Sequence, residues 1–521
     1  MTDATLHPYR HAIDHPDRPA FVVADTGAVL TYRALDEASN RAAQLFRSLG
    51  LRPGDRIGLL LRNGPDFPIA YWGAQRAGLM TAPLSTHLKP EEAAYILKDC
   101  NARVLVTGRD VGDSAVALAA AHASGELGVD AVFDVCAPPM AGAQNWQDAL
   151  AAQPATPIDD ETAGYYLVYS SGTTGRPKGI ILPFTPGPIG QLGQTEQASI
   201  ARLQGFDPLV TFNGAPLYHA APLVSMIVTH RAGGTAVVLR KFGAEAALRA
   251  IDQWKVKSAQ FVPTMFVRML ALPDEVRARY DVTSLEMVVH AAAPCPVDVK
   301  RRMMDWFGPI IHEYYSGSEA VGQCYITPEE WLRKPGSVGR AVWGILHICD
   351  DSGDEVPTGE DGLVYFESDR PFEYLNDPEK TAKSRHPRHP TWIALGDIGH
   401  VDADGYLFLT DRKDFMIISG GVNIYPQAAE NRLIDHPDVA DAAVIGIPDP
   451  EYGEGVLGIV QPAPGVEAGP ALERRLIDHC RAAISNIACP RTIRFVEELP
   501  RLPTGKLAKH ELRRRFSTVD A

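Results

Sequence analysis

The sequence predicts a mixed α/β fold: a large N-terminal domain made of two α/β lobes and a β-rich subdomain, and a small α+β C-terminal domain. Helix-like and strand-like stretches alternate up to residue 310, which is typical of sheets covered by helices. After residue 330 the pattern changes to short strands with Asp-Gly turns, and after residue 433 a separate α/β pattern begins. The 521 residues leave room for about three structural units.

The first lobe opens with apolar residues at helical spacing over 31–50, a stretch that ends in Gly50. Short apolar runs of strand length follow, together with a helix that Pro90 opens at a favourable first-turn position. The strands are predicted at 56–61 and 104–108 and the helix at 90–101. Residues 136–160 are rich in Ala and Pro, which predicts a surface excursion and not a domain break.

A further alternation of apolar runs and amphipathic stretches predicts the second lobe. Its strands are expected at 235–240, 259–263 and 285–294, and its helices at 244–254 and 297–307. The β-rich subdomain is expected at 362–368 and 392–412, and the segment 411–433 joins it to the C-terminal domain. That domain is expected to contain strands at 439–449, 455–463 and 492–500 and a helix at 470–484.

Charge and cysteine content exclude several classes of protein. Lys plus Arg total 50 and Asp plus Glu total 64, so the formal charge is −14, which disfavours nucleic acid and anionic membrane surfaces as partners. The seven cysteines form no CxxC pair, so a zinc ribbon or a disulfide scaffold is not expected. The N-terminus has no signal-peptide core and no run suits a membrane span, which predicts a cytoplasmic protein.

The segment Tyr169–Gly179 has the composition of a phosphate-binding loop between two apolar runs. Hydroxyl groups, backbone N–H groups exposed by glycine and one lysine can all donate to phosphate oxygens. The residues concerned are Ser170, Ser171, Gly172, Thr173, Thr174, Gly175 and Lys178. The loop is not a Walker A motif, because Lys178 precedes a glycine and a strand where that motif has Ser or Thr opening a helix.

This loop resembles the signature loop of the adenylate-forming superfamily, which includes acyl-CoA synthetases, stand-alone adenylation domains and beetle-type luciferases. The resemblance continues in the same order over nearly the whole chain. In Pro216–His219 it implies that His219 lies beside the carboxylate being activated. In His290–Pro294 it implies that adenine packs on small residues at a strand end, namely Ala292, Ala293 and Pro294.

The segment Tyr314–Glu319 is similar to the family's Tyr-Gly-x-Thr-Glu motif. The similarity implies that Tyr315 stacks on adenine, Ser318 contacts the α-phosphate and Glu319 binds Mg²⁺, with Thr174 as a further metal ligand. Magnesium prefers carboxylate and phosphate oxygens. Tyr314 and Gly317 belong to the same predicted nucleotide site, and Ser316 replaces the usual glycine and narrows the space there.

The remaining motifs describe the ribose site, the hinge and the C-terminal domain. The resemblance assigns Asp397 to the ribose hydroxyls, Arg412 to ribose or phosphate, and Asp414 to a hinge. It implies domains at 1–412 and 416–521 with the hinge at 413–415, Gly420 and Gly421 beside the pantetheine arm, and Lys506 on the substrate carboxylate and α-phosphate. Leu395 departs from the family's Thr-Gly-Asp pattern.

The resemblance implies an ATP-, Mg²⁺- and coenzyme A-dependent acid–CoA ligase with a mobile C-terminal domain. The segments expected to form the acyl pocket contain no charge for a second carboxylate, which favours an apolar medium-chain, long-chain or bulky cyclic acid. A carrier-protein-loading adenylation enzyme, a luciferase-like oxidation and a non-catalytic nucleotide- or acyl-binding regulator remain alternatives. The sequence leaves homodimer formation open.

Overall fold

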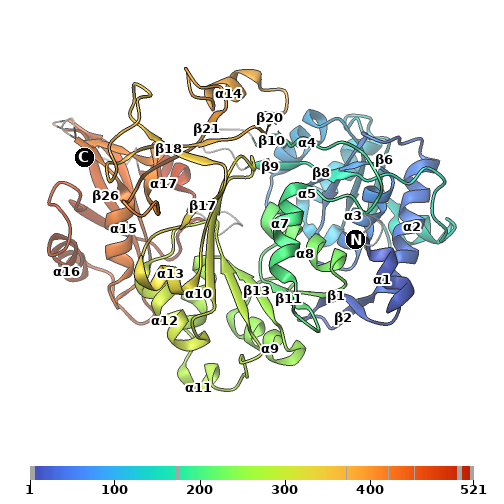
Figure 1. Cartoon of the computed structure of the whole chain (residues 1–521), viewed down its shortest axis with the longest axis horizontal. Helices are drawn as coiled ribbons and strands as arrows, with labels where there is room; N and C mark the ends of the chain where they lie inside the picture. The colour runs from blue at the N-terminus through green and yellow to red at the C-terminus, as the bar shows by residue number, and fades with distance from the viewer. Residues whose placement is uncertain are drawn as a thin grey trace.

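The computed structural model of the chain describes residues 6–170, 177–370, 372–419, 422–450, 452–501 and 507–516. In Figure 1 the C-terminal domain, drawn in orange and red, lies at one end of the long axis. The lobe that contains the first part of the chain, drawn in blue and teal, lies at the other end. The second lobe, in green and yellow, lies between them, which fits the predicted large N-terminal and small C-terminal domains.

The first lobe is built on a six-stranded parallel sheet with the order β7-β6-β5-β3-β4-β8. Its strands are β3 (Arg56–Leu60), β4 (Met80–Pro83), β5 (Ala102–Thr107), β6 (Ala131–Asp134), β7 (Gln144–Asn145) and β8 (Tyr165–Tyr166). Its helices are α1 (Pro8–Asp14), α2 (Tyr32–Ser48), α3 (Asp66–Arg76), α4 (Pro90–Asp99), α5 (Asp113–Ala123) and α6 (Trp146–Ala151). The covered, parallel sheet agrees with the continuous apolar runs of its strands.

The second lobe is built on a nine-stranded sheet with the order β17-β16-β15-β14-β13-β11-β12-β1-β2. Its strands are β1 (Pro19–Val23), β2 (Ala28–Thr31), β11 (Val210–Asn213), β12 (Thr235–Val238), β13 (Ser258–Phe261), β14 (Met287–His290), β15 (Ile311–Ser316), β16 (Gln323–Ile326) and β17 (Arg340–Trp343). Its helices are α7 (Gln194–Leu203), α8 (Ala220–Arg231), α9 (Ala244–Trp254), α10 (Pro263–Leu270), α11 (Asp274–Arg277), α12 (Val297–Phe307) and α13 (Pro328–Arg333). Six neighbouring strands of this sheet are parallel, namely β1, β12, β11, β13, β14 and β15. The carboxyl ends of β11, β13, β14 and β15 therefore meet at one edge.

Two smaller sheets border that edge. An antiparallel sheet has the order β18-β19-β21-β22, with β18 (Ile345–Cys349), β19 (Gly362–Glu367), β21 (Trp392–Val401) and β22 (Leu407–Arg412). A three-stranded sheet joins β9 (Val168–Ser170), β10 (Lys178–Ile181) and β20 (Glu373–Tyr374), which α14 (Pro378–Lys383) follows. The hairpin of β9 and β10 places the predicted phosphate loop between two strands, as expected from the sequence.

The C-terminal domain contains a five-stranded sheet of β23 (Ile417–Ser419), β24 (Val422–Ile424), β25 (Val439–Asp449), β26 (Gly453–Pro462) and β27 (Thr492–Phe495). Helices α15 (Pro426–Ile434), α16 (Pro470–Arg481) and α17 (Lys509–Phe516) pack on it. Two apolar clusters of its own, one around Leu433 and Leu476 and one around Leu457 and Leu512, give the domain a separate core.

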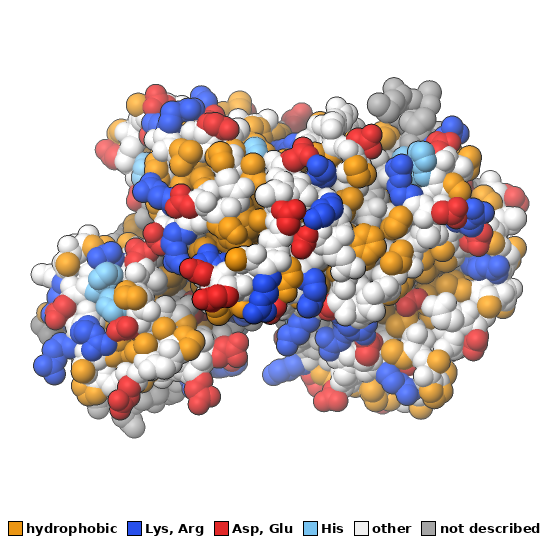
Figure 2. All heavy atoms as spheres, turned by 90° about the horizontal axis from the view of Figure 1, so that it is seen from below, with side chains coloured by type: hydrophobic (Ala, Val, Ile, Leu, Met, Phe, Trp, Pro, Cys, Tyr) orange, Lys and Arg blue, Asp and Glu red, His pale blue; other side chains and the backbone are white. Residues whose placement is uncertain are grey.

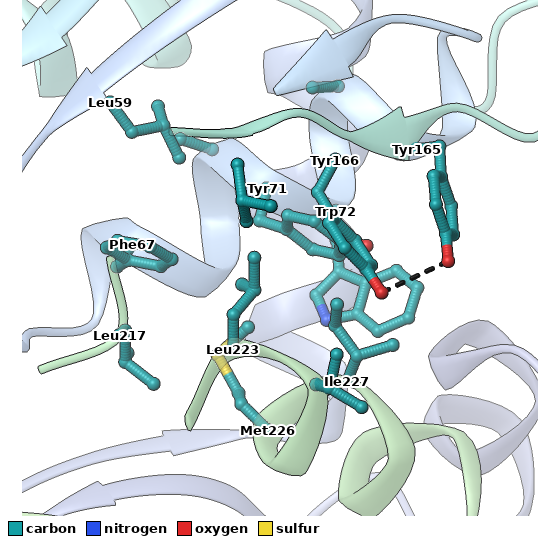
Figure 3. Packing of buried hydrophobic residues seen from close by; sticks show 14 of the residues in the cluster. Leu59, Phe67, Tyr71, Trp72, Tyr165, Tyr166, Leu217, Leu223, Met226 and Ile227 are labelled. Atoms are coloured by element: carbon teal, nitrogen blue, oxygen red, sulfur yellow. Dashed lines mark hydrogen bonds between the residues drawn. The ribbon is translucent and has the colours of Figure 1, made fainter. Parts of the chain in front are cut away.

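The two lobes of the N-terminal domain share one core, because α3 is buried along its whole length except at its first residue. Figure 3 shows Tyr71 and Trp72 of α3 facing Leu223, Met226 and Ile227 of α8. The indole Nε1 of Trp72 donates to Nδ1 of His230 at 3.0 Å, and the other ring nitrogen of His230 contacts the Ala20 carbonyl at 3.0 Å. Burial lowers the pKa of His230 to about 3, so the ring is neutral and has a structural role.

One prediction about the first lobe is wrong for the middle of the segment concerned. The segment 136–160 is not only a surface excursion, because its middle forms β7 and α6. Trp146 is fully buried and contacts Phe46 and Phe133, and Leu150 is also buried. The Ala- and Pro-rich composition concealed these two anchoring side chains.

Candidate active site

A cavity of about 2790 Å³ lies at the carboxyl edge of the nine-stranded sheet and extends to the C-terminal domain. It is lined by the predicted residues Lys178, His219, Ala292, Ala293, Pro294, Tyr314, Tyr315, Ser316, Gly317, Ser318, Glu319, Asp397, Arg412 and Asp414. Figure 2 shows a hollow between the two lower lobes of that view, with Lys and Arg side chains gathered on its rim. Positive groups gathered this way favour anionic ligands locally, although the whole chain is acidic.

Asp397 is the centre of one hydrogen-bonded group in this cavity. It lies on β21 directly opposite Arg412 of β22. Its Oδ1 accepts from Nε of Arg412 at 2.9 Å, and its Oδ2 accepts from the hydroxyl of Tyr315 at 2.6 Å. Burial and the Asp397 carboxylate raise the pKa of Tyr315 well above its usual value, so the hydroxyl keeps its proton and donates. The group joins two sheets at the strand that leads into the predicted hinge.

Glu319 forms a second group with Tyr374, a residue that sequence reasoning missed. The Tyr374 hydroxyl donates to Oε1 of Glu319 at 2.7 Å, and burial together with Glu319 raises the pKa of that hydroxyl. A Cβ at Gly317 would lie 2.5 Å from Oε2 of Glu319, so a larger residue there would displace the end of that side chain. In the part of the chain that the structure describes, Oε2 of Glu319 accepts no hydrogen bond, and carboxylate oxygens are ligands that Mg²⁺ prefers, so Glu319 fits the predicted metal role. Among the described residues no group of three His, Cys, Asp or Glu side chains could hold a metal ion, so such an ion would depend on substrate oxygens.

The base of the predicted phosphate loop is a regular antiparallel hairpin. Lys178 of β10 pairs with Ser170 of β9, and its Nζ lies 3.1 Å from Oδ2 of Asp377. Lys380 on α14 lies close to Lys178. Burial is the largest cause of the lowered pKa of Lys380, and the positive charge of Lys178 is the next. Two lysines therefore lie near each other at the cavity wall, with the carboxylates of Asp377 and Glu319 close by. Ser171, Gly172, Thr173, Thr174 and Gly175 lie outside the described residues.

The strand end after β14 has an unusual backbone. Ala292 has φ of 76°, in the left-handed region that a residue with a Cβ rarely adopts. Such strain costs about 1–3 kcal/mol and gathers at functional sites. Together with Ala293 and Pro294, Ala292 lines the cavity with small side chains, as expected for a surface that a flat base approaches.

Adjacent residues of β15 point to opposite faces of the sheet, so Tyr314 and Tyr315 have different surroundings. Tyr315 reaches Asp397, whereas the Tyr314 hydroxyl accepts from Nε2 of Gln260 at 3.2 Å. Tyr314 and Tyr315 thus line the same cavity with different hydrogen-bond partners, and the nucleotide-binding role of Tyr314 stays a prediction. Ser316 donates to the Gly322 carbonyl at 2.7 Å, which holds its side chain against the backbone.

His219 is the N-cap residue of α8 and packs edge-on against Tyr218, with ring centroids 4.6 Å apart. Both residues line the cavity, and the position of His219 beside the substrate carboxylate stays a prediction. A charged residue that lines the same cavity, Arg202 on α7, lies outside the segments that the sequence predicts for the acyl pocket, which are 218–224, 262–266, 291–295 and 316–323. Arg202 therefore adds a cation that those segments do not contain.

The predicted hinge forms a short 3₁₀ helix, η3 (Lys413–Phe415), between the two domains. The guanidinium of Arg513 on α17 donates to the carbonyl oxygens of Asp414 at 3.2 Å and of Phe415 at 3.4 Å. On the other side, Oδ2 of Asp411 accepts from the backbone N–H of Gln427 at the start of α15. Gly420, Gly421 and Lys506 lie outside the described residues.

Known families match both domains. Residues 9–373 match the model of the AMP-binding enzymes, and residues 428–506 match that of the AMP-binding enzyme C-terminal domain. The chain belongs to the AMP-binding enzyme family. This membership confirms the resemblance to the adenylate-forming superfamily and the mixed α/β fold with a large and a small domain.

Relatives of this AMP-binding enzyme act on different acids. A feruloyl-CoA synthase of Amycolatopsis sp is 33% identical over 98% of both chains. The long-chain-fatty-acid–CoA ligase FadD13 of Mycobacterium tuberculosis is 29% identical over 97% of this chain and 96% of the relative. The crystal structure of the anthranilate CoA ligase AuaEII in complex with anthranoyl-AMP has a TM-score of 0.81 and 27% identity, covering 98% of this chain and 96% of AuaEII. The chain thus lies within a family of acid–CoA ligases. Separately, no described helix is long and apolar enough to cross a membrane.

Proposed function

We propose that this AMP-binding enzyme is an ATP-dependent acid–CoA ligase. The observation that supports it most is the placement of Asp397, Arg412, Tyr315 and Glu319 on one cavity wall beside the Lys178 hairpin. Bound ATP needs three kinds of group: a carboxylate for the vicinal diol of its ribose, cations for its phosphates and a carboxylate for Mg²⁺.

In the first half-reaction, an oxygen of the substrate carboxylate attacks the α-phosphorus of ATP and the bond to pyrophosphate breaks. The products are the acyl-adenylate and pyrophosphate. Both reactants are anionic, so the enzyme has to offset several negative charges in a small volume. Lys178, Lys380 and Arg412 lie at the cavity for this purpose, and we propose Lys506 as the lysine beside the reacting oxygens.

Magnesium, held on the protein side by Glu319 and Thr174, would supply further positive charge to the phosphates. The substrate provides its own nucleophile, so this chain's residues mainly bind and orient. Tyr315 and Arg412 hold the Asp397 carboxylate in place for the ribose hydroxyls. His219, at the start of α8, is proposed to position the substrate carboxylate.

In the second half-reaction, the thiol sulfur of coenzyme A attacks the acyl carbon, a thioester forms and AMP leaves. We propose that the domains are 1–412 and 416–521 and that the second turns about Asp414, which removes Lys506 and presents Gly420 and Gly421. At η3, Arg513 contacts backbone carbonyl oxygens and Lys413 forms an exposed ion pair with Asp351, and such exposed contacts can exchange during the motion.

The acyl body is proposed to be larger than a short-chain acid. Apolar side chains from α8 and α10, among them Val224, Val228 and Met265, line part of the cavity and support a medium-chain, long-chain or bulky cyclic body.

Pyrophosphate release tests the proposal. With ATP, Mg²⁺ and a suitable acid, the wild-type enzyme should release pyrophosphate, and added coenzyme A should yield an acyl-CoA and AMP in equal amounts. Adenylate formation with transfer only to a carrier protein would support the alternative acceptor. Binding of ATP without pyrophosphate from any acid would favour a non-catalytic regulator.

A further inference from the structure

We infer that the acid substrate carries a second oxygen acceptor on its acyl body, such as a carboxylate, phenolate or carbonyl, and that Arg202 binds it. This inference rests on the proposed function and narrows its substrate class. It starts from the wall of the cavity that lies below α7 and α8.

The sheet face at this wall is mostly polar, which is unusual for an interior surface. Residues two apart on a strand, and residues directly paired between strands, share a face. By this register the following side chains lie on one face and line the cavity: Thr211, Asn213, Ser258, Gln260, Met287, Val289, Tyr314, Ser316 and Gln323, so that seven polar side chains flank two apolar ones on β14. A wall built for a plain hydrocarbon chain would not contain this row, because burying polar groups against alkyl surface costs free energy.

Hydrogen bonds within the row orient the Tyr314 hydroxyl so that its proton can donate to a ligand. Asn213 donates to Oε1 of Gln260 at 2.9 Å, and Gln260 donates to the Tyr314 hydroxyl oxygen. Among the hydrogen bonds of the described residues, the Tyr314 proton has no acceptor. Burial raises the pKa of Tyr314, so that proton stays on the hydroxyl.

Arg202 adds a cation beside this row. Its Nη2 donates to Oε1 of Gln323 at 2.8 Å, and its guanidinium lies 4.4 Å from the centroid of the Tyr325 ring. Within the described ranges Arg202 forms no ion pair with a carboxylate. Both contacts fix the side chain without neutralising it, so most of its five N–H groups remain for a ligand.

The opposite side of the same space is apolar, with Leu203 of α7 and Val224 and Val228 of α8. An acyl body with a hydrocarbon surface on one side and an oxygen group on the other matches both walls. Aromatic or cyclic acids with an oxygen substituent fit this description, as do linear acids with an oxygen group at the far end. The shared chemistry is the acceptor oxygen.

Matched pairs of acids, one pair for a cyclic acyl body and one for a linear body, test the inference. Cinnamate is compared with 4-hydroxycinnamate and 4-carboxycinnamate, and decanoate with decanedioate, by kcat/KM for pyrophosphate release. We expect at least one oxygenated acid to exceed its plain partner by about 10-fold or more, as for a hydrogen bond to a charged group. The arm in which this occurs identifies a cyclic or a linear substrate.

Variants then assign the preference to Arg202. Arg202→Met should raise KM for the preferred oxygenated acid by about 10–100-fold, with little change for its plain partner, and Arg202→Lys should restore part of the loss. Arg249→Met, an exposed arginine on α9 outside the cavity, is the matched control. Tyr314→Phe should have a smaller effect in the same direction.

Two results overturn the inference in different ways. If plain acids are preferred, or Arg202→Met weakens plain and oxygenated acids equally, Arg202 does not read a second oxygen, while the ligase function stands. If no acid releases pyrophosphate from ATP, the proposed function fails and this inference fails with it.

Discussion

The Tyr315 hydroxyl donates a 2.6 Å hydrogen bond to Oδ2 of Asp397, and this contact joins the nine-stranded sheet to the antiparallel sheet beside the hinge. Arg412 binds the other oxygen of the same carboxylate. Both oxygens therefore have fixed directions before a ligand arrives. A preorganised carboxylate loses less entropy on binding a diol than a mobile one does.

Removing the Tyr315 hydroxyl should loosen that carboxylate. For Tyr315→Phe we expect KM for ATP in pyrophosphate release to rise about 2–10-fold, because one hydrogen bond to a charged group is lost. Since the ring is retained, any stacking on adenine should persist and kcat should change little. Tyr280→Phe, whose hydroxyl donates to Glu245 outside the cavity, controls for loss of a tyrosine hydroxyl. An unchanged KM for ATP would mean that Tyr315 does not position the Asp397 carboxylate.

The Glu319 carboxylate should set the magnesium requirement. Glu319→Gln keeps an oxygen that can accept from Tyr374 but loses the negative charge, so Mg²⁺ should bind more weakly. We expect the Mg²⁺ concentration for half-maximal pyrophosphate release to rise about 10-fold or more, an order-of-magnitude figure for a lost charged ligand. Glu286→Gln, which removes a surface partner of Lys257, is the control. Equal Mg²⁺ curves for Glu319→Gln and wild type would rule out this ligand role.

Lys506 should serve only one half-reaction. Lys506→Ala should lower adenylate formation by about 100-fold or more, in the range for removal of one group that stabilises transition-state charge. Thioester formation from supplied acyl-adenylate and coenzyme A should continue near the wild-type rate. Burst measurements of pyrophosphate and acyl-CoA separate the two steps. Equal loss in both would contradict a role confined to adenylation.

Periodicity predicts the secondary structure well where apolar spacing is regular. The helices expected at 244–254 and 297–307 coincide with α9 and α12. Composition alone misleads for 136–160, where two buried side chains, Trp146 and Leu150, decide the local structure. Those two anchors depend on partners far away in the chain, which no local pattern contains.

Motifs predict the cavity residues but not their partners. Tyr315 and Glu319 reach the cavity because parallel strands end at the same sheet edge, and Asp397 and Arg412 come from the antiparallel sheet that borders this edge. Tyr374 belongs to no motif that the sequence analysis used, and its place beside Glu319 depends on how β20 packs. Arg202 was missed for the same reason: nothing in the sequence of α7 indicates which sheet face it covers.

A buried ion group beneath this edge should control stability. Lys300 of α12 is fully buried, and its Nζ lies 2.7 Å from Oε2 of Glu313 on β15, while Nε2 of His290 lies 3.3 Å from the same oxygen. Burial alone would raise the pKa of Glu313, but His290 and Lys300 outweigh it and hold that pKa below its usual value. Lys300→Met removes the buried ammonium group that lies nearest to the Glu313 carboxylate, at a cost of about 3–5 kcal/mol.

Urea unfolding midpoints of wild type, Lys300→Met and the double variant Lys300→Met/Glu313→Gln test this, because a chain with two domains has no single free energy of unfolding. The single variant should unfold at a lower urea concentration at pH 7, and the double variant should recover part of the loss. Because the pKa of Glu313 is lower in the folded state than in the unfolded state, its carboxylate stabilises the fold at pH values above the unfolded pKa near 4.5. This stabilisation is lost as the pH falls below that value, so wild type should become less stable under acid. Lys300→Met removes one of the two groups that lower the pKa of Glu313, so this pKa should rise and the deficit relative to wild type should shrink as the pH falls from 7 to 4. A deficit that does not change with pH would mean that lost packing, including the contact of Lys300 with the Trp331 ring, explains the destabilisation.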